Sequence, residues 1–278
     1  MIHRFCISHE KPLLPESWYD VCISLGDYQP DSVSHVRQLD QFWHEARPIA
    51  YGTAGTNVLP IAIERFASAA TLIEICSHRK RVLASSEGIE SELVSGCREL
   101  RFGDFEEKAE LSVQMPPADL EFLIPQPLYF ENSIVEKQIE LRHYDRRDLR
   151  DYTSIAIEMG ALESDSLNEF LAARHFIPGG SQIGIYPKSW LMSKLSKREL
   201  IDRQFLSRYR HRIEKYEAVQ IRAVSFLAEC LGSFLLIRHL AEKYSNNIPA
   251  GIFGYVTVIL DSDIWHAQGI EKVNRARK

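Results

Sequence analysis

The chain has 278 residues, 45% hydrophobic and 26% charged, with a formal net charge of −5 at pH 7. This composition is typical of a globular protein that buries a substantial core, and it argues against a nucleic-acid binder that depends on a global basic field. Any anionic ligand must therefore be held by a local cluster of cations.

The first 125 residues alternate short apolar runs with amphipathic segments, a pattern typical of an α/β sheet. Strands are predicted at residues 4–8, 20–25, 72–76 and 120–124. Helices are predicted at residues 33–44 and 56–69. Residues 84–118 are rich in Ser, Glu and Pro and have no clear period, so we expect an irregular excursion there.

From about residue 132 the pattern becomes helical. Predicted helices run from 132 or 133 to 141, from 145 to 159, from 164 or 165 onward, and over 197–217 and 219–241. An extended piece at 179–188 interrupts them, and a β-branched strand is predicted at 251–260. Because no linker is visible, we expect a single domain, 1–278, with an α/β half (1–130) and a mainly helical half (131–278).

The longest apolar stretch, residues 223–237, contains Glu229 and falls short of the roughly 20 residues that a membrane span needs. It therefore predicts a buried helix. Five scattered cysteines without a CxxC pair indicate reduced thiols, and the polar amino-terminal segment does not resemble a secretory signal. We expect a cytoplasmic protein without a transmembrane segment, free or associated with the inner face of the membrane.

Polar groups follow three of the predicted strands. The strand at 72–76 stops at Ser77-His78-Arg79-Lys80-Arg81, and His9 and Asp27 follow the two earlier strands. Ligands of open α/β sheets bind at the carboxyl ends of strands. Taken singly, each loop is better explained as a solvated turn. Together they suit a nucleotide, with an acid for the ribose hydroxyls and cations for the diphosphate.

The second half offers weaker candidates. His143 stands at the break between two predicted helices, and Gly180 belongs to a glycine pair that permits close backbone approach to a ligand. Arg222 and Glu229 share one face of the apolar helix. A carboxylate there is either paired structurally, with Arg222 or another cation, or functional.

Two further patterns bear on the chemistry. Asp261 and Asp263 form an Asp-x-Asp pair after the last predicted strand, and such a pair can chelate a divalent metal. This match is short, and we assign no metal ligand; the need for a divalent metal stays open. No glycine-rich phosphate loop is present, which disfavours a phosphotransferase.

Several segments, taken in order, resemble a family of bacterial glycosyltransferases from capsule and O-antigen gene clusters. This family was formerly a domain of unknown function and includes galactofuranosyltransferase-type domains. The amino-terminal strand followed by His9 and Lys11-Pro12 resembles its opening motif. The stretch 72–83 resembles its strand running into His-Tyr-Arg-Arg, with Ser77 to Lys80 in those four places. Positions that match later motifs are His143, Asp148, the segment 179–191, Arg222 and Glu229.

The resemblance implies a GT-A-like fold with a nucleotide-binding half at 1–130 and an acceptor-side half at 131–278. It implies a nucleotide-sugar donor, with UDP-sugars first, and a glycan acceptor, lipid-linked or free, with no nucleic acid. Arg79 and Lys80 would neutralise the departing diphosphate, and His9, Asp27 and His78 would line the nucleotide and donor sugar. His78 and Arg79 are also candidates for the catalytic step, with Glu229 as the general base if configuration is inverted. Further donor-binding positions implied are His143, Gly180, Ser181 and Arg222. The alternative is a non-catalytic glycan- or partner-binding protein on a degenerate transferase fold.

Overall fold

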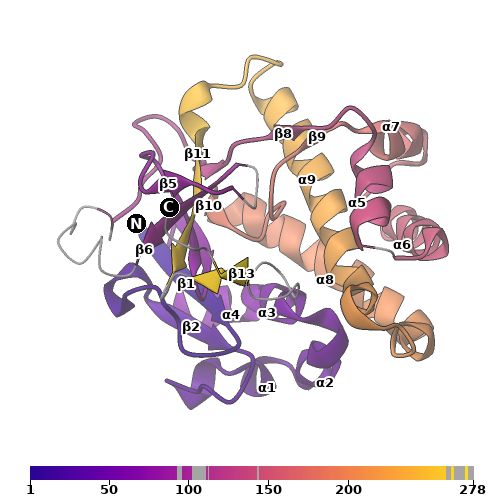
Figure 1. Ribbon diagram of the computed structural model, residues 1–278, viewed down its shortest axis with the longest axis horizontal. Coiled ribbons are helices and arrows are strands. Elements are labelled where there is room, and N and C mark those ends of the chain that lie inside the picture. Colours follow the sequence, from indigo (N-terminus) through magenta and orange to yellow (C-terminus); the bar gives the residue numbers. More distant parts are fainter. Residues whose placement is uncertain are drawn as a thin grey trace.

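The structure is a computed structural model that describes residues 1–92, 96–101, 111, 113–142, 144–260, 264–265 and 273–274. Within these residues a nine-stranded mixed sheet forms the centre, and Figure 1 shows α5–α9 gathered on one side of it. The predicted α/β class with a helical carboxyl-terminal half is confirmed.

The sheet draws strands from both halves of the chain. Its order is β2 (Val21–Ser24), β1 (Ile2–Ser8), β3 (Leu72–Ser77), β4 (Lys80–Leu83), β11 (Phe253–Leu260), β6 (Cys97–Arg101) and β5 (Ile89–Glu90). In addition, β10 (Gly184–Pro187) pairs with β3, and β7 (Ile124–Pro125) pairs with β11. β1, β2 and β3 are parallel, and β4 is antiparallel to both β3 and β11. β11 therefore runs in the same direction as the first three strands.

Two of the predicted helices are divided in the structure, and the others differ in their ends. They are α1 (Val36–Leu39), α2 (Gln41–Ala50), α3 (Gly52–Asn57), α4 (Leu59–Phe66), α5 (Ile134–Arg142), α6 (Arg146–Glu158), α7 (Leu167–Ala172), α8 (Lys188–Ile213) and α9 (Ala223–Lys243). The predicted helix 33–44 is broken because the Asp40 carboxylate accepts from the Phe42 N–H and so caps a new helix. The predicted helix 56–69 is likewise replaced by α3 and α4, with Pro60 in the first turn of α4.

Three strand predictions need correction. β4 lies where the sequence indicated only a basic loop, and β6 lies inside the predicted irregular excursion. The predicted strand at 120–124 shrinks to β7, which begins only at Ile124 and includes Pro125. Short pairs outside the main sheet are β8 (Leu128–Tyr129) with β9 (His175–Phe176), and β12 (Ile264–Trp265) with β13 (Val273–Asn274).

One hydrophobic core joins the sheet to the carboxyl-terminal helices. It includes Phe5, Ile75, Phe205 and Leu227, each at most 1% exposed. The segment Val219–Lys243 is long and apolar enough to cross a membrane, but 56% of its most apolar window is buried inside the fold. α9 is thus packed here as a core helix, as the sequence predicted.

Candidate functional site

The ends of the parallel strands meet at one edge of the sheet. In the register of β1 with β2, Ser8 lies level with Ser24, and in the register of β1 with β3, Ile7 lies level with Ser77. The loops that carry His9, Asp27 and His78 therefore leave the sheet at the same edge.

The basic segment is a tight turn rather than an open loop. β3 and β4 are joined through His78 and Arg79, and the backbone of both residues is hydrogen-bonded. The His78 N–H donates to the Ile7 carbonyl at 3.2 Å, and its own carbonyl accepts from the Leu13 N–H at 2.6 Å. The Arg79 carbonyl accepts from the Ile259 N–H of β11 at 2.8 Å. These bonds fix the backbone from which the half-buried Arg79 side chain projects.

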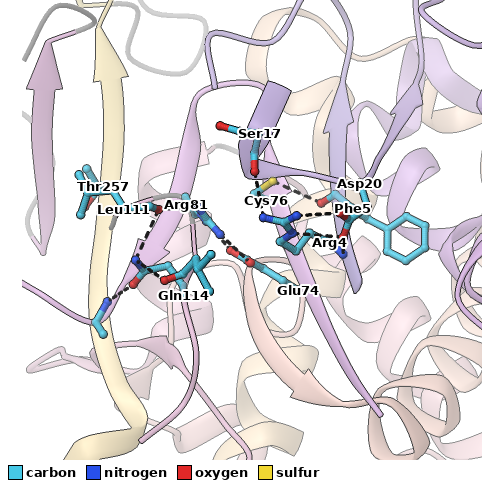
Figure 2. A network of polar contacts seen from close by, with 12 residues as sticks. Arg4, Phe5, Ser17, Asp20, Glu74, Cys76, Arg81, Leu111, Gln114 and Thr257 are labelled. Carbon is cyan, nitrogen blue, oxygen red and sulfur yellow. Dashed lines mark hydrogen bonds and ion pairs between the residues drawn. The ribbon is translucent and has the colours of Figure 1, made fainter. Parts of the chain in front are cut away.

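Arg81 belongs to the core and not to the ligand-facing surface. Successive residues of β4 point to opposite faces, so Arg81 points away from its neighbour Lys80. Its guanidinium is 0% exposed, holds Glu74 through two hydrogen bonds of 2.5 and 2.9 Å, and donates to the Leu111 carbonyl at 2.8 Å. Figure 2 shows this network beside the pair of Arg4 and Asp20. The sequence grouped Arg81 with the polar residues that follow the strand at 72–76, and the structure corrects this grouping.

His9 lies in a strongly cationic setting. Its Nδ1 is 3.4 Å from Nη2 of Arg47, a residue in the last turn of α2. Burial, reinforced by the charges of Arg47 and Arg222, lowers the pKa of His9 to about 4. At neutral pH the imidazole is therefore uncharged and offers one donor and one acceptor nitrogen.

His78 is neutral for the same kind of reason. Burial, followed by the charges of Arg79, His9 and Lys80, lowers its pKa to about 4. Nε2 of His78 lies 3.7 Å from Oε1 of Glu10. Because the imidazole is uncharged near pH 7, this approach is not an ion pair there, and the 76% exposed Glu10 side chain is well solvated.

Arg222, the residue just before α9, and Glu229 of α9 approach the same region. The Arg222 guanidinium lies over the ring of Tyr51, 4.9 Å from its centroid, and 5.4 Å from that of Phe226. Oε1 of Glu229 accepts a hydrogen bond of 2.7 Å from the Gly179 N–H. This bond holds the carboxylate in place and gives it a structural role. The sequence had left open whether Glu229 is structural or functional.

Lys80 links the β3–β4 turn electrostatically to Arg222 and Glu229. Burial lowers its pKa; Cys97 and Glu229 act to raise it, whereas Arg79 and Arg222 lower it. Charges from the β3–β4 turn and from α9 thus act on one half-buried ammonium group. We call the whole set the strand-end cluster: it comprises His9, Arg47, His78, Arg79, Lys80, Arg222 and Glu229.

Other predicted site residues lie elsewhere or have other contacts. Asp27 is exposed beyond the end of β2. Gly180 has φ +55°, and a Cβ there would lie 2.9 Å from the Glu229 carbonyl oxygen, so its close approach is to α9. Ser181 is 4% exposed and lines a separate cavity between α8 and α9. The binding roles of these three residues stay predictions. His143, together with the Asp261 and Asp263 pair, falls outside the described residues.

Two residues of this region were missed from sequence. Arg47 resembles any basic residue in the last turn of a helix, and only the folded chain brings it to His9. Tyr51 links α2 to α3 with φ +48°, a backbone conformation rare for a non-glycine residue. No local pattern reveals either. In the part of the chain that the structure describes, no group of three or more His, Cys, Asp or Glu side chains is arranged to hold a metal ion.

Comparison with known proteins supports the architecture. Neither the family models nor the curated proteins searched gave a match. Among solved structures, the chain is similar to the apo form of WbbM, a bifunctional glycosyltransferase, with a TM-score of 0.63 and 14% sequence identity. The match covers 92% of this chain and 45% of WbbM, so the chain spans less than half of that protein. A similarity at this identity shows the fold, and it confirms the GT-A-like class expected from the sequence.

Proposed function

We propose that the protein is a glycosyltransferase that moves a sugar from a nucleotide-sugar donor to a glycan acceptor in the assembly of a bacterial surface polysaccharide. The observation that carries the proposal is the strand-end cluster, which gathers cations and two uncharged imidazoles at the carboxyl edge of the sheet. The fold shared with a bifunctional glycosyltransferase supports it.

The cations suit the departing diphosphate. In the transfer, the acceptor oxygen bonds to the anomeric carbon while the bond from that carbon to the diphosphate oxygen breaks. Negative charge then grows on the nucleoside diphosphate. Arg79 and Lys80, next to one another at the β3–β4 turn, stabilise that charge, and Arg222 adds to the same field. A UDP-sugar is the first donor to test.

The imidazoles bind without adding charge. With pKa values near 4, His9 and His78 each present a donor and an acceptor nitrogen at neutral pH. Hydroxyl groups of a ribose or a sugar also donate and accept, so uncharged imidazoles complement them. The exposed Asp27, at the same edge, is placed to accept from a ribose hydroxyl.

Glu229 is the candidate general base. If the reaction inverts configuration, its carboxylate takes the proton of the attacking acceptor hydroxyl. The hydrogen bond from the Gly179 N–H holds one carboxylate oxygen in place and therefore orients the group. The glycan acceptor, lipid-linked or free, then approaches from the side of α9 and the 177–183 loop.

The test is a calorimetric and thermal-shift screen of UDP- and GDP-sugars with and without Mn²⁺, followed by turnover with glycan acceptors. Arg79→Ala should abolish the shift and reduce turnover by about 100-fold, the scale of one preorganised oxyanion donor. The matched control is Arg150→Ala, which removes an arginine that is 73% exposed on α6.

The outcomes separate the hypotheses. Full turnover in Arg79→Ala would remove the assigned role of the β3–β4 turn. Binding of a sugar nucleotide that requires Arg79, without transfer or hydrolysis, would favour the non-catalytic binding protein. A cooperative melt with no shift for any nucleotide would reject both donor binding and the transferase.

A further inference from the structure

The junction between α2 and α3 has a backbone conformation that glycine normally adopts. Tyr51, the residue between the two helices, has φ +48° and ψ −131°. This is the conformation of the first central residue of a type II′ turn, a position dominated by glycine. Gly52 follows directly and would adopt it without steric cost, yet Gly52 begins α3 instead. Strain of this kind persists only where the surrounding structure imposes it.

Hydrogen bonds on both sides of Tyr51 impose this conformation. The Ser225 hydroxyl of α9 donates to the Ala50 carbonyl at 2.8 Å and accepts from the Thr53 hydroxyl at 3.0 Å. The Tyr51 N–H donates to the Arg47 carbonyl at 2.8 Å and closes the last turn of α2. The residues before and after Tyr51 are thus tied to α9, and the place of its ring is fixed by the backbone.

The fixed ring of Tyr51 contacts Arg222, three residues before Ser225. The Arg222 guanidinium lies 4.9 Å from the centroid of the Tyr51 ring and 5.4 Å from that of Phe226, both within the range of a cation–π interaction. Phe226 is 4% exposed and packs in the core, whereas Tyr51 is half-buried. Two rings therefore restrict the rotation of a long side chain, and its N–H groups donate in the directions that the rings leave open.

The charge of Arg222 reaches the carboxyl edge of the sheet. It is among the charges that lower the pKa of His9, after the end of β1, and of Lys80, at the start of β4. The proposed function places the donor diphosphate at this edge. A guanidinium bonds phosphate oxygens through N–H groups in its own plane, so its orientation matters more than that of an ammonium group.

We propose that Tyr51 is a positioning residue for donor binding: its ring orients the Arg222 guanidinium toward the diphosphate of the sugar nucleotide. This inference rests on the proposed function, because it concerns the same site. The strained backbone then has a reason, since a glycine at position 51 would relieve the strain but leave one side of the guanidinium without a ring.

The test is isothermal titration calorimetry of the full chain with UDP and with GDP. Tyr51→Leu keeps an apolar side chain without an aromatic face and should weaken binding about fivefold. Tyr51→Phe keeps the ring and should bind as the parent does. Arg222→Gln should weaken binding about tenfold or more. Adding Tyr51→Leu to Arg222→Gln should cause no further loss, because the ring acts through the guanidinium.

Two comparisons separate this role from a general structural one. The matched control is Tyr209→Leu, which removes a ring of α8 that lies 4.4 Å from the Arg212 guanidinium and should leave the affinity unchanged. Tyr51→Gly should melt about 2–4 °C above Tyr51→Ala, since only glycine relieves the strain. At an unstrained position the order would be reversed, because glycine loses more backbone entropy on folding.

Each contrary result overturns a stated step. Parental affinity in Tyr51→Leu removes the positioning role. A loss that persists in the Arg222→Gln background shows that the ring does not act through Arg222, and an equal loss in Tyr51→Phe assigns the effect to the hydroxyl. A higher melting temperature for Tyr51→Ala than for Tyr51→Gly excludes the strain. Absence of binding by UDP and GDP to a parent protein that melts cooperatively rejects the proposed function and this inference together, whereas failure of the inference alone leaves parental binding intact.

Discussion

Acidification should destabilise the protein through His78, and the size of the effect follows from its surroundings. The pKa of His78 is about 4 in the folded chain and 6.5 in the reference state. Between these values the unfolded chain binds a proton that the folded chain does not. The free energy of unfolding is therefore at its full value above about pH 6.5 and decreases as the pH falls toward 4. Linkage gives a loss of about 2 kcal/mol by pH 5. Since the side chain is 25% exposed, that figure is an upper bound.

Urea unfolding at pH 7 and pH 5 measures this loss. His78→Gln keeps a polar side chain but cannot titrate, so its stability should fall between the two pH values by about 1–2 kcal/mol less than that of the parent. Carboxylates elsewhere titrate equally in both proteins and cancel in the difference. His211→Gln, which removes an exposed imidazole of α8, is the control and should show the parental pH dependence. Equal losses in His78→Gln and the parent would refute the assignment of a buried, uncharged imidazole.

Three further predictions concern stability and turnover. Glu74→Gln should reduce the free energy of unfolding by about 3 kcal/mol or more, because it leaves the buried Arg81 charge uncompensated; an unchanged denaturation midpoint would contradict this. Glu229→Gln keeps an amide oxygen as acceptor for the Gly179 N–H but removes a charge that acts on Lys80, so the variant should still melt cooperatively while turnover falls by about 10²-fold or more. Parental turnover would exclude Glu229 as the base. Gly180→Ala should lower the free energy of unfolding by about 2 kcal/mol more than Gly160→Ala. Both glycines have positive φ, but only at Gly180 would the added Cβ meet backbone, 2.9 Å from the Glu229 carbonyl oxygen. Equal melting temperatures of the two variants would show that α9 can move aside.

The residues at the carboxyl edge of the sheet were predictable because each strand and the loop that follows it depend on a short, continuous stretch of sequence. β-branched runs predict strands, and polar residues that follow them predict the loops at the ends. The register of Ser8 with Ser24 and of Ile7 with Ser77 then brings those loops together, as expected for parallel strands. This reasoning found the loops of His9 and His78 without any information on tertiary structure.

What could not be predicted depends on contacts between distant segments. Arg79 and Arg81 have the same chemistry in the sequence, yet only Arg81 is inserted into the core, because Glu74 of β3 supplies a buried carboxylate for it. Arg47 reaches His9 across 38 positions of sequence. Gly180 looked like a position for ligand approach, but the backbone that approaches it is that of α9. A glycine pair indicates a close approach by other atoms, but it does not tell whether these belong to a ligand or to another segment of the chain.

The electrostatics of the strand-end cluster also explain why a net acidic chain can hold an anion. Charges beyond roughly 8 Å are largely screened at physiological ionic strength, so the net charge of −5 has little effect at this edge. Three guanidinium groups, of Arg47, Arg79 and Arg222, act there against the carboxylate of Glu229. The same guanidinium charges, added to burial, keep His9 and His78 uncharged. Positive charge is thus fixed on groups that do not release a proton near neutral pH, while the imidazoles remain able both to donate and to accept. This division suits a ligand that combines a diphosphate with neutral hydroxyl groups better than one that is anionic throughout.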